Sequence, residues 1–492
     1  MSRTSSVKQV ADALERAGLL VERRGPLPDR VTGITDDSRA VTPGGVFVAV
    51  RGTQRDGHSF LAAAEQAGAA MAIVEDAAAT TLPALVVHGG RRAAAIAAAA
   101  FYGEPATRVT LVAVTGTNGK TTTVGMLRHL LDSDGARAAS IGTLGVLVGS
   151  AGEPLPGGGG LTTPGPIELQ RLLRLLVDAG VRHVAMETSS HALDQLRVEG
   201  LEFAAAVFTN LTRDHLDYHG TMDQYFWAKA LLVGYLGPKG VAVSNADDPA
   251  WLALPDAPRK LSFGVTSPGA DVRAEDVEFH PRGSRWTLVR GDARAPVELP
   301  LIGDFNVANA LGAAAAAIAV GLDVATVAAR LCALPQVPGR LEILSEHPTV
   351  LRDYAHTPDA LERALLALRP FTPGRLIVLF GCGGDRDKGK RPMMADVAHR
   401  LADAVVVTSD NPRTEDPEAI LDDICAALPA GSYERIEDRR TAIATAIAMA
   451  DPVRDVVLLA GKGHETYQIR GTTSYPFDEA AIVRELLDRG NG

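Results

Sequence analysis

Short apolar runs recur along the chain, and most of them stop abruptly at a polar or glycine-rich segment. In the middle of the chain, VTLVAV (109–114) leads into TGTNGKT, VRHVAM (181–186) into ETSSH, and AAAVFT (204–209) into NLTRDH. Uninterrupted apolar runs are typical of parallel strands that are buried on both faces. The pattern therefore predicts an α/β domain with a mostly parallel sheet.

The same design returns nearer the C-terminus. RLIVLF (375–380) leads into GCGGDRDKGKRP, AVVVT (404–408) into SDNPRTEDP, and VVLLA (456–460) into GKGHETYQ. Ligands of open α/β sheets bind beyond the carboxyl ends of the strands, so each set of three motifs is expected to face one crevice. Two crevices suggest a reaction between two bound substrates at a domain interface.

The remaining pattern concerns domain organisation. Residues up to about 107 mix short strand-like runs with Ala-rich helical stretches, which predicts a small α/β unit. A chain of 492 residues is too long for one ordinary core. The Gly/Pro-rich stretch at 149–166 is expected to be a long functional loop rather than a linker. We expect an α/β fold with three domains, at residues 1–107, 108–338 and 339–492.

Composition narrows the class of protein. Apolar residues at 46% and charged residues at 22% are usual for a soluble globular protein. The net charge of -10 argues against general nucleic-acid binding, which needs a basic face, but allows small anions in a local positive pocket. Three widely spaced cysteines fit reduced thiols better than a disulfide framework: Cys332, Cys382 and Cys425. With no signal peptide and no membrane-length apolar run, we expect a cytoplasmic protein, acting as a monomer.

The segment VTGTNGKTTTVG (114–125) has the residues of a phosphate-binding loop, but two residues separate Gly116 from Gly119 where the common pattern has four. Backbone amides and the start of the following helix would bind phosphate oxygens. Lys120 would neutralise phosphate charge, and Thr121 would bind Mg²⁺. The alternative is an ordinary glycine turn. The order of strand, loop, Lys-Thr and helix favours the phosphate loop.

Two other motifs supply possible metal ligands. Glu187 follows a strand, where its carboxylate can complete a Mg²⁺ shell, although a glutamate there is commonly just solvated. His215 and His219 lie in TRDHLDYHG, and one of them would bind metal or orient a phosphate. Spacing does not choose between the two histidines, and a turn rich in hydrogen bonds is the alternative for both.

Lys229 lies in a predicted helix over 222–236. A lysine in such a helix usually extends its ammonium group to water. If it were buried near the crevice, its pKa would fall and the neutral amine would react with CO₂ to give a carbamate, an anionic oxygen ligand for Mg²⁺. Composition and spacing alone give that idea little support.

Charged residues of the C-terminal motifs suggest a pocket for a zwitterion. Arg386 and Arg413 carry guanidinium groups suited to bidentate binding of a carboxylate, and Glu465 can pair with an ammonium group. Each residue alone fits surface charge equally well. Together, at three neighbouring strand ends, they predict an amino-acid site.

The motifs together resemble the ATP-dependent Mur ligase family of peptidoglycan synthesis, most closely its diaminopimelate-adding members. The shortened loop TGTNGKTT is typical of the family. Other matching segments, in the family's order, are DDSRAVTPGGVFVAVRGTQRDGHSF, METSSHALDQLRV, FTNLTRDHLDYHGTMDQYFWAKALL, GDFNVANALGAAAA, VPGRLE, DYAHTPDAL, FGCGGDRDKGKRP, SDNPRTEDP and AGKGHETYQI.

The resemblance implies an N-terminal domain for the UDP-sugar substrate, a central P-loop-type ATPase and a C-terminal Rossmann-like domain. It implies that ATP phosphorylates the D-glutamyl carboxylate of UDP-MurNAc-L-Ala-D-Glu, and that the amine of diaminopimelate attacks the acyl phosphate. The enzyme would serve cell-wall synthesis, and so cell shape and division. Alternatives are an L-lysine-adding relative, folylpolyglutamate synthetase, and a nucleotide-driven switch or binding ATPase.

The resemblance also implies roles for individual residues. Those matched to ATP contacts are Gly116, Thr117, Asn118, Gly119, Lys120, Thr121, Thr122, Asn309, Arg340, Asp353 and His356. Those matched to the UDP-MurNAc-dipeptide are Ser38, Thr53, Gln54, Arg55, Thr162, Thr163, Ser189, Gln195 and Arg197. Thr121 and Glu187 match ligands of one Mg²⁺, and His215 and carbamylated Lys229 match the second. The implied catalytic residues are Lys120, Glu187, His215 and Lys229.

The amino-acid site carries the family's diaminopimelate signature, DNPR. Residues matched to diaminopimelate are Arg386, Asp410, Asn411, Pro412, Arg413, Gly461 and Glu465. Diaminopimelate has a distal carboxylate that lysine lacks, so a buried arginine would be left unpaired with lysine bound. Arg413 would serve the meso and LL forms alike, and the meso form is expected. Leu161 departs from the pattern, since some relatives have Asn there.

Overall fold

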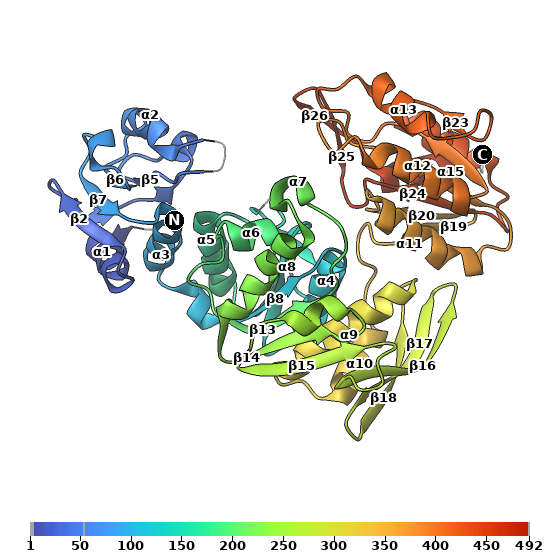
Figure 1. Ribbon diagram of the computed structural model, residues 1–492, viewed down its shortest axis with the longest axis horizontal. Coiled ribbons are helices and arrows are strands. Elements are labelled where there is room, and N and C mark those ends of the chain that lie inside the picture. Colours follow the sequence, from blue (N-terminus) through green and yellow to red (C-terminus); the bar gives the residue numbers. More distant parts are fainter. Residues whose placement is uncertain (1–3, 53–54, 159, 491–492) are drawn as a thin grey trace. The chain divides into compact units, whose positions relative to one another are not determined.

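The computed structural model describes residues 4–52, 55–158 and 160–490. They group into two compact units. The first contains the chain up to 273 together with residues 288–295 and 308–330, and the second contains residues 274–287, 296–307 and 331 onward. Figure 1 shows the order of the elements along the chain.

The N-terminal part of the first unit is a five-stranded sheet in the order β2-β7-β6-β5-β4. Its strands are β2 (Leu20–Arg24), β4 (Ile34–Thr35), β5 (Val46–Val48), β6 (Met71–Val74) and β7 (Ala84–Val87). Strands β1 (Ser5–Ser6) and β3 (Arg30–Val31) form a separate two-stranded sheet. Its helices are α1 (Val7–Arg16), α2 (Leu61–Gln66) and α3 (Gly90–Tyr102). Helices α1 and α3 share one apolar cluster with the sheet, and α2 shares another. The small α/β unit expected from the sequence is confirmed.

The central sheet has eleven strands in the order β11-β10-β9-β12-β8-β13-β14-β15-β16-β17-β18. They are β8 (Thr110–Thr115), β9 (Arg137–Gly142), β10 (Gly145–Val148), β11 (Glu153–Leu155), β12 (Val181–Glu187), β13 (Phe203–Phe208), β14 (Leu236–Asn245), β15 (Arg259–Gly264), β16 (Val272–His280), β17 (Gly283–Arg290) and β18 (Ala293–Leu299). Strands β9, β12, β8, β13, β14 and β15 are parallel. Because β12, β8 and β13 are neighbours, the three polar motifs that follow them meet at one edge of the sheet.

The helices of this region follow the predicted pattern with two corrections. They are α4 (Lys120–Leu131), α5 (Pro166–Asp178), α6 (Ser190–Asp194), α7 (Leu216–His219), α8 (Met222–Ala230), α9 (Asp304–Ala319) and α10 (Val324–Cys332). The helix that carries Lys229 ends at Ala230 and tightens into a 3₁₀ turn, Leu231–Tyr235, in a stretch that contains the poor helix former Gly234. The stretch 149–166 is not all loop, since β11 pairs with β10 across a turn in which Gly149 and Gly152 have positive φ.

The second unit is built around a six-stranded sheet in the order β19-β20-β24-β21-β22-β23. The strands are β19 (Glu342–Glu346), β20 (Thr349–Asp353), β21 (Leu376–Phe380), β22 (Ala404–Val407), β23 (Glu434–Arg435) and β24 (Val456–Ala460), and β25 (Tyr467–Arg470) and β26 (Thr473–Pro476) form a hairpin. Its helices are α11 (Pro358–Leu368), α12 (Lys390–Leu401), α13 (Pro417–Cys425), α14 (Arg439–Met449) and α15 (Glu479–Gly490).

Helices cover both faces of this sheet. Helices α11, α12 and α13 share one apolar cluster with it, and α14 and α15 share the other. Strands β20, β24, β21 and β22 are parallel, so the motifs after β21, β22 and β24 leave the same edge. The Rossmann-like arrangement predicted for the C-terminal part is confirmed.

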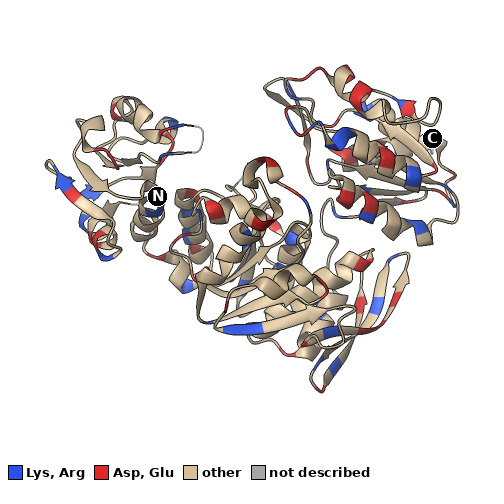
Figure 2. Cartoon of the chain, viewed as in Figure 1, with Lys and Arg blue, Asp and Glu red and all other residues tan. Residues whose placement is uncertain are grey.

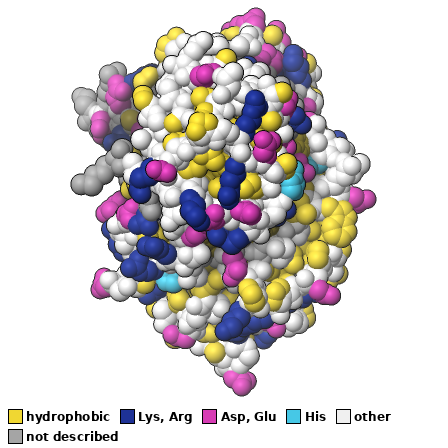
Figure 3. Space-filling view, turned by 90° about the vertical axis from the view of Figure 1, so that its left-hand side faces the viewer, with side chains coloured by type: hydrophobic (Ala, Val, Ile, Leu, Met, Phe, Trp, Pro, Cys, Tyr) yellow, Lys and Arg dark blue, Asp and Glu magenta, His cyan; other side chains and the backbone are white. Residues whose placement is uncertain are grey.

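Charged residues are spread over the elements of both units (Figure 2). On the face shown in Figure 3, Lys and Arg side chains lie among Asp, Glu and hydrophobic side chains. Among the helices formed by the described residues, none combines the length and apolar character needed to cross a membrane.

A buried ion pair holds the strand ends of the second unit in place. Arg439 and Glu479 are both fully buried, and Arg439 Nε donates to Glu479 Oε1 at 2.8 Å. The same guanidinium donates to the carbonyl oxygens of Ser409 at 3.3 Å and Ala460 at 2.9 Å. These two residues directly precede the DNPR and GKGHE segments, so the pair fixes the start of both.

We expect Arg439→Met to lower the free energy of unfolding of the second unit by about 3–5 kcal/mol, because Glu479 would stay buried without its partner. Hydrogen exchange of the β22 and β24 amides would measure this loss. The matched control is Arg440→Met, whose ion pair with Glu485 is exposed and should contribute less than about 1 kcal/mol. Equal effects of the two substitutions would contradict the assignment.

Candidate functional site

The phosphate loop, residues 116–121, connects β8 to α4 and needs glycine at two positions. Gly116 and Gly119 have φ of 144° and 85°, in the range that L side chains rarely adopt. A Cβ on Gly116 would lie 1.9 Å from Thr209 Oγ1, and one on Gly119 would lie 2.3 Å from Asn309 Oδ1. Asn309, predicted from the resemblance to contact ATP, is thus placed directly against the loop.

The loop is held by the segment that follows β13. Asn210 Oδ1 accepts from the amide of Asn118 at 2.9 Å, and the Asn210 carbonyl accepts from the amide of Thr117 at 2.8 Å. Thr209 Oγ1 donates to the Asn118 carbonyl at 2.7 Å, and Thr117 Oγ1 donates to the Thr212 carbonyl at 3.0 Å. Thr209, Asn210 and Thr212 were not predicted from the sequence, although β13 was one of the three strands predicted to end at the site.

Two lysines converge on one carbonyl of the loop. Lys120 Nζ donates to the carbonyls of Gly116 and Thr117 at 2.9 and 2.8 Å. Lys229 Nζ donates to the same Gly116 carbonyl at 2.8 Å. Two lysine side chains therefore lie at the place where the sequence predicts bound phosphate.

Lys229 is the more deeply buried of the pair. Its exposed fraction is 1%, and its Nζ lies 4.4 Å from the centre of the Tyr225 ring. Burial lowers the pKa of Lys229 well below its ordinary range, and the charge of Lys120 lowers it further, while Asp214 opposes the shift. The ordinary alternative, a lysine that reaches water, is wrong for this residue.

Glu187 sits in a close-fitting cradle at the end of β12. Its exposed fraction is 1%. Its Oε1 accepts from the amide of Thr143 at 2.8 Å, and its Oε2 accepts from the Thr143 hydroxyl at 3.2 Å. A Cβ on Gly142 would lie 2.3 Å from Oε1. The solvated glutamate considered from the sequence is therefore wrong, and the carboxylate has a fixed orientation.

The structure separates the two candidate histidines. His219 is buried, and its Nε2 lies 2.9 Å from Ser190 Oγ. His215 has a φ of 53° and stays partly exposed. Desolvation lowers the pKa of His215 to about 4; Asp214 opposes the shift, and His191, Lys120 and Lys229 add to it. His215 is thus neutral at pH 7, which is the form that binds metal.

His191, which was not predicted from the sequence, lies between the two histidines and contacts both rings. Its ring centre lies 4.9 Å from that of His215, 5.3 Å from that of His219 and 4.2 Å from that of Tyr218. The residue was visible in the ETSSH motif, but nothing in its spacing indicated ring contacts with a segment 24 residues or more away.

Five residues predicted to bind the muramoyl peptide form a connected network. Thr163 Oγ1 donates to the Glu187 carbonyl at 2.9 Å and accepts from the Ser189 amide at 3.1 Å. Arg197 Nη1 donates to the Thr163 carbonyl at 2.9 Å. The remaining contacts are Arg197 Nη2 to Gln195 Oε1 at 2.8 Å and Thr143 Oγ1 to Thr162 Oγ1 at 3.3 Å.

The other residues of that predicted set lie in the N-terminal part. Ser38 begins a 3₁₀ turn, Ser38–Ala40, whose start is capped by Asp37 accepting from the Arg39 amide at 3.0 Å. Arg55 is exposed, and Thr53 and Gln54 lie outside the described residues. Leu161, which departs from the family pattern, is 50% exposed.

In the second unit, the predicted amino-acid site does gather at neighbouring strand ends. Asn411 Nδ2 donates to Glu465 Oε2 at 2.8 Å, which joins the segments after β22 and β24. Arg413 has a φ of 53°, and its Nη1 donates to the Gly384 carbonyl at 3.0 Å in the segment after β21. Arg386 is exposed and donates to the Asp385 carbonyl at 3.1 Å.

Two further predicted residues complete this cluster. Gly461 has a φ of 113°, and a Cβ there would lie 3.1 Å from Asp410 Oδ2. Pro412 lies in the segment after β22. Its carbonyl oxygen is 1.9 Å from the position that a Cβ on Gly384 would take. Lys462, which the sequence motifs did not single out, is fully buried and contacts Asp410, Asn411 and Glu465.

Three residues of the second unit that the resemblance matched to ATP also lie together. Asp353 Oδ2 accepts from the Leu341 amide at 2.7 Å, and the Arg340 guanidinium lies 4.8 Å from the centre of the Tyr354 ring. Burial raises the pKa of Asp353 to about 6, against the charge of Arg340. His356 Nδ1 lies 2.8 Å from the Tyr354 carbonyl.

A metal ion bound near the phosphate loop would need oxygen ligands in addition to the carboxylate and imidazole groups of the protein. Within the described ranges, no group of three or more His, Cys, Asp or Glu side chains is placed to hold a metal ion. Mg²⁺ is commonly bound by one or two carboxylates, water and substrate phosphates rather than by a complete protein cage. The cradled Glu187 carboxylate and the Thr121 hydroxyl fit that kind of site.

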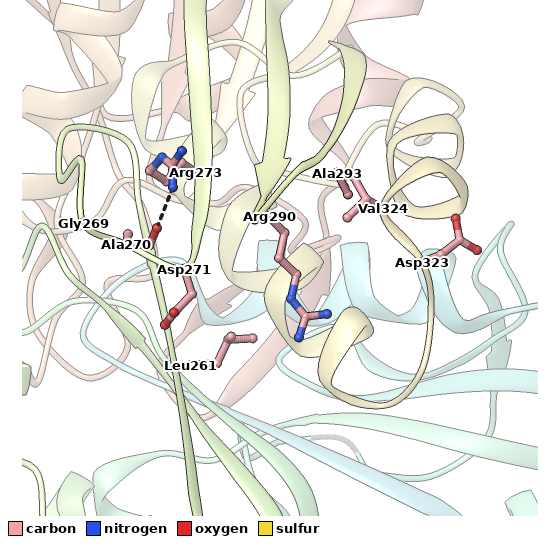
Figure 4. Close-up of a pocket in the computed structure, with 10 residues that line it drawn as sticks. Leu261, Gly269, Ala270, Asp271, Arg273, Arg290, Ala293, Asp323 and Val324 are labelled. Atoms are coloured by element: carbon pink, nitrogen blue, oxygen red, sulfur yellow. Dashed lines mark hydrogen bonds between the residues drawn. The ribbon is translucent and has the colours of Figure 1, made fainter.

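A separate surface groove of about 730 Å³ lies in the first unit (Figure 4). None of the residues lining it belongs to the predicted sites. Asp271 accepts from the Ser262 amide at 2.8 Å, Asp323 accepts from the Thr326 amide at 2.9 Å, and Arg273 donates to the Ala270 carbonyl at 3.2 Å. These three charged side chains thus serve local structure, and the strand-end clusters are better candidates.

Comparison with known proteins gives consistent matches along the chain. Three family models match: "Mur ligase family, catalytic domain" at residues 30–115, "Mur ligase middle domain" at 114–317, and "Mur ligase, glutamate ligase domain" at 339–463. The UDP-N-acetylmuramoyl-L-alanyl-D-glutamate–2,6-diaminopimelate ligase of Gloeobacter violaceus is 45% identical, covering 97% of this chain and 98% of its own. The Geobacillus thermodenitrificans protein of that name is 46% identical, covering 94% and 96%.

Solved structures agree with the fold. A structure of a UDP-N-acetylmuramoyl-L-alanyl-D-glutamate–2,6-diaminopimelate ligase matches with a TM-score of 0.69 and 34% identity, covering 100% of both chains. MurF ligase from Thermotoga maritima in complex with ADP matches with a TM-score of 0.64 and 21% identity, covering 93% of this chain and 97% of that one.

We expect Gly119→Ala to weaken ATP binding at least about tenfold, or about 1.4 kcal/mol. The new methyl group would collide with Asn309 and would need a strained φ. Calorimetric titration with ATP would measure the change. Gly135→Ala is the matched control, because a Cβ there meets nothing within 4 Å. Normal ATP affinity in Gly119→Ala would remove this loop from nucleotide binding.

Proposed function

This chain belongs to the Mur ligase family, and on that premise we propose that it is an ATP-dependent ligase that joins 2,6-diaminopimelate to UDP-MurNAc-L-Ala-D-Glu. The observation that carries the proposal is the likeness, over nearly the whole chain, to ligases named for this reaction. The product is a precursor of peptidoglycan. The DNPR segment disfavours the alternative, a lysine-adding ligase. In this segment Asn411 contacts Glu465, and Arg413 follows in the chain.

We assign one main substrate to each proposed domain. Residues 1–107 bind the UDP-MurNAc portion, residues 108–338 bind ATP, and residues 339–492 bind the amino acid. The protein acts in the cytoplasm, where its nucleotide substrates are made, and as a monomer, since one chain carries all the named residues.

The reaction needs two steps because a carboxylate is a poor electrophile. In the first, the D-glutamyl carboxylate attacks the γ-phosphorus of ATP, ADP leaves, and an acyl phosphate forms. In the second, the amine of diaminopimelate attacks the acyl carbon, phosphate leaves, and the amine loses a proton as the amide forms. Lys120 offsets the negative charge of the transferred phosphoryl group.

When Mg²⁺ is bound, its positive charge offsets further negative charge on the phosphates. Thr121 and Glu187 would hold one ion, and His215 with a carbamylated Lys229 would hold a second. The protein's part is to keep these donors oriented, which the Thr143 contacts do for Glu187.

The surroundings of Lys229 support carbamylation. The lowered pKa leaves a neutral amine, whose nitrogen attacks CO₂ to form an N–C bond and release one proton. The carbamate nitrogen keeps one N–H, so its bond to the Gly116 carbonyl can persist. The new negative charge would then lie beside Lys120, so the carbamate would have an oppositely charged neighbour.

We propose complementary roles for the charged groups at the amino-acid site. Arg386 and Arg413 receive carboxylates of diaminopimelate, and Glu465 receives an ammonium group. The Arg413 guanidinium is aimed by its bond to the Gly384 carbonyl. A lysine substrate would leave one guanidinium without a carboxylate partner.

The function is tested by phosphate release from ATP in the presence of UDP-MurNAc-L-Ala-D-Glu with meso-diaminopimelate, LL-diaminopimelate, L-lysine or no amino acid. We expect release and the tripeptide mass with meso-diaminopimelate. Release with lysine alone would overturn the diaminopimelate proposal. Release without any amine would instead favour a binding ATPase.

We expect Lys229→Ala to lower kcat at least about a hundredfold, within the range for loss of a catalytic group, and a small added carboxylate to restore part of it. ¹³C-bicarbonate should give a carbamate NMR signal in the parent protein that Lys229→Ala lacks. Lys239→Ala, at an exposed lysine, is the control. Full activity in Lys229→Ala, or an unchanged NMR spectrum, would exclude the carbamate.

A further inference from the structure

Lys462 is a fully buried cation among the predicted amino-acid-binding residues. Its Nζ lies 3.1 Å from Asn411 Oδ1, 3.3 Å from Glu465 Oε2 and 3.4 Å from Asp410 Oδ1. An ammonium group has three donors, and these three acceptors account for them. Burying such a charge is costly unless it is paired and hydrogen-bonded, so its surroundings must be built to hold it.

The ammonium group fixes the orientation of Asn411. Oδ1 of Asn411 accepts both from Lys462 and from the Ile469 amide, the latter at 2.9 Å. Two donors on one side of the amide leave its NH₂ group facing the other way, where it donates to Glu465 Oε2 at 2.8 Å. Glu465 Oε2 thus receives two donors, one from Lys462 and one from Asn411.

Charge balance gives the arrangement a second property. Asp410 and Glu465 carry two negative charges against the single positive charge of Lys462, so the group sums to one negative charge. That sum suits one ammonium group of an amino acid. Without Lys462, the two carboxylates would repel each other with no positive charge between them, so Glu465 would not be held in the same position.

We propose that Lys462 is a positioning residue that sets Asn411 and Glu465 to receive the ammonium group of a zwitterionic amino-acid substrate. The proposal rests on the proposed function of this same site. Lys462 acts through its two neighbours, and its full burial keeps its own ammonium group away from solvent.

The test uses Lys462→Met, which keeps the apolar stem and removes the charge. We expect the KM for meso-diaminopimelate to rise at least tenfold, while the KM for ATP stays within twofold. The charge-balanced double variant Lys462→Met with Asp410→Asn restores a sum of one negative charge. Its KM for meso-diaminopimelate should be at least threefold lower than that of Lys462→Met, which a purely structural role of Lys462 would not predict.

The control is Arg435→Met in the same unit. Arg435 also lies between two carboxylates, Glu418 and Asp422, but its substitution should leave the KM for diaminopimelate within twofold. An unchanged KM for diaminopimelate in Lys462→Met, or equal rises for diaminopimelate and ATP, would overturn the proposal. So would a double variant no better than the single one.

Two outcomes are kept apart by measuring the parent protein first. A parent that does not use diaminopimelate contradicts the proposed function, whereas a parent that does, with an unaffected Lys462→Met, contradicts only the role of Lys462. If Lys462→Met shows no cooperative thermal unfolding, the double variant decides: a KM within tenfold of the parent's supports the charge balance, and a larger rise contradicts it.

Discussion

The carbonyl oxygen of Gly116 accepts hydrogen bonds from two lysines, Lys120 and Lys229, and much of the first unit's site follows from that convergence. Burial takes Lys229 out of water, and the charge of Lys120 disfavours a second ammonium group beside it, so both effects lower the pKa of Lys229. The positive charge of Lys120 also favours anions at this place, and phosphate groups and a carbamate would both supply negative charge.

The surrounding segments keep that convergence in place. The Gly116 backbone can approach so closely because no Cβ stands between it and Thr209. The Asn210 side chain fixes the amide of Asn118, and Glu187 is held by Thr143 one strand away. Each support comes from a different strand end, so the geometry exists only because β9, β12, β8 and β13 are neighbours in the sheet.

One part of the amino-acid site in the second unit has the opposite sign of charge. There a single buried ammonium group, on Lys462, lies among Asp410, Asn411 and Glu465, and the local sum is negative. Arg439 fixes the two strand ends that carry these residues through the Ser409 and Ala460 carbonyls. Positive charge at the loop suits phosphates, and the negative sum of Asp410, Glu465 and Lys462 suits an ammonium group, in keeping with a ligase that activates an acid and then delivers an amine to it.

The sequence by itself determined the parts that depend on neighbouring residues. Apolar runs ending in polar motifs predicted β8, β12, β13, β21, β22 and β24, and the Gly-Lys-Thr order predicted the loop before α4. Tertiary structure decided which of His215 and His219 pairs with Ser190, whether Lys229 reaches water, and that Lys462 belongs to the site. Burial and pairing join segments far apart in the chain: Lys229 bonds to a carbonyl 113 residues away, and Lys462 to a side chain 51 residues away. Local spacing carries no information about such contacts, because they exist only after the strands have paired.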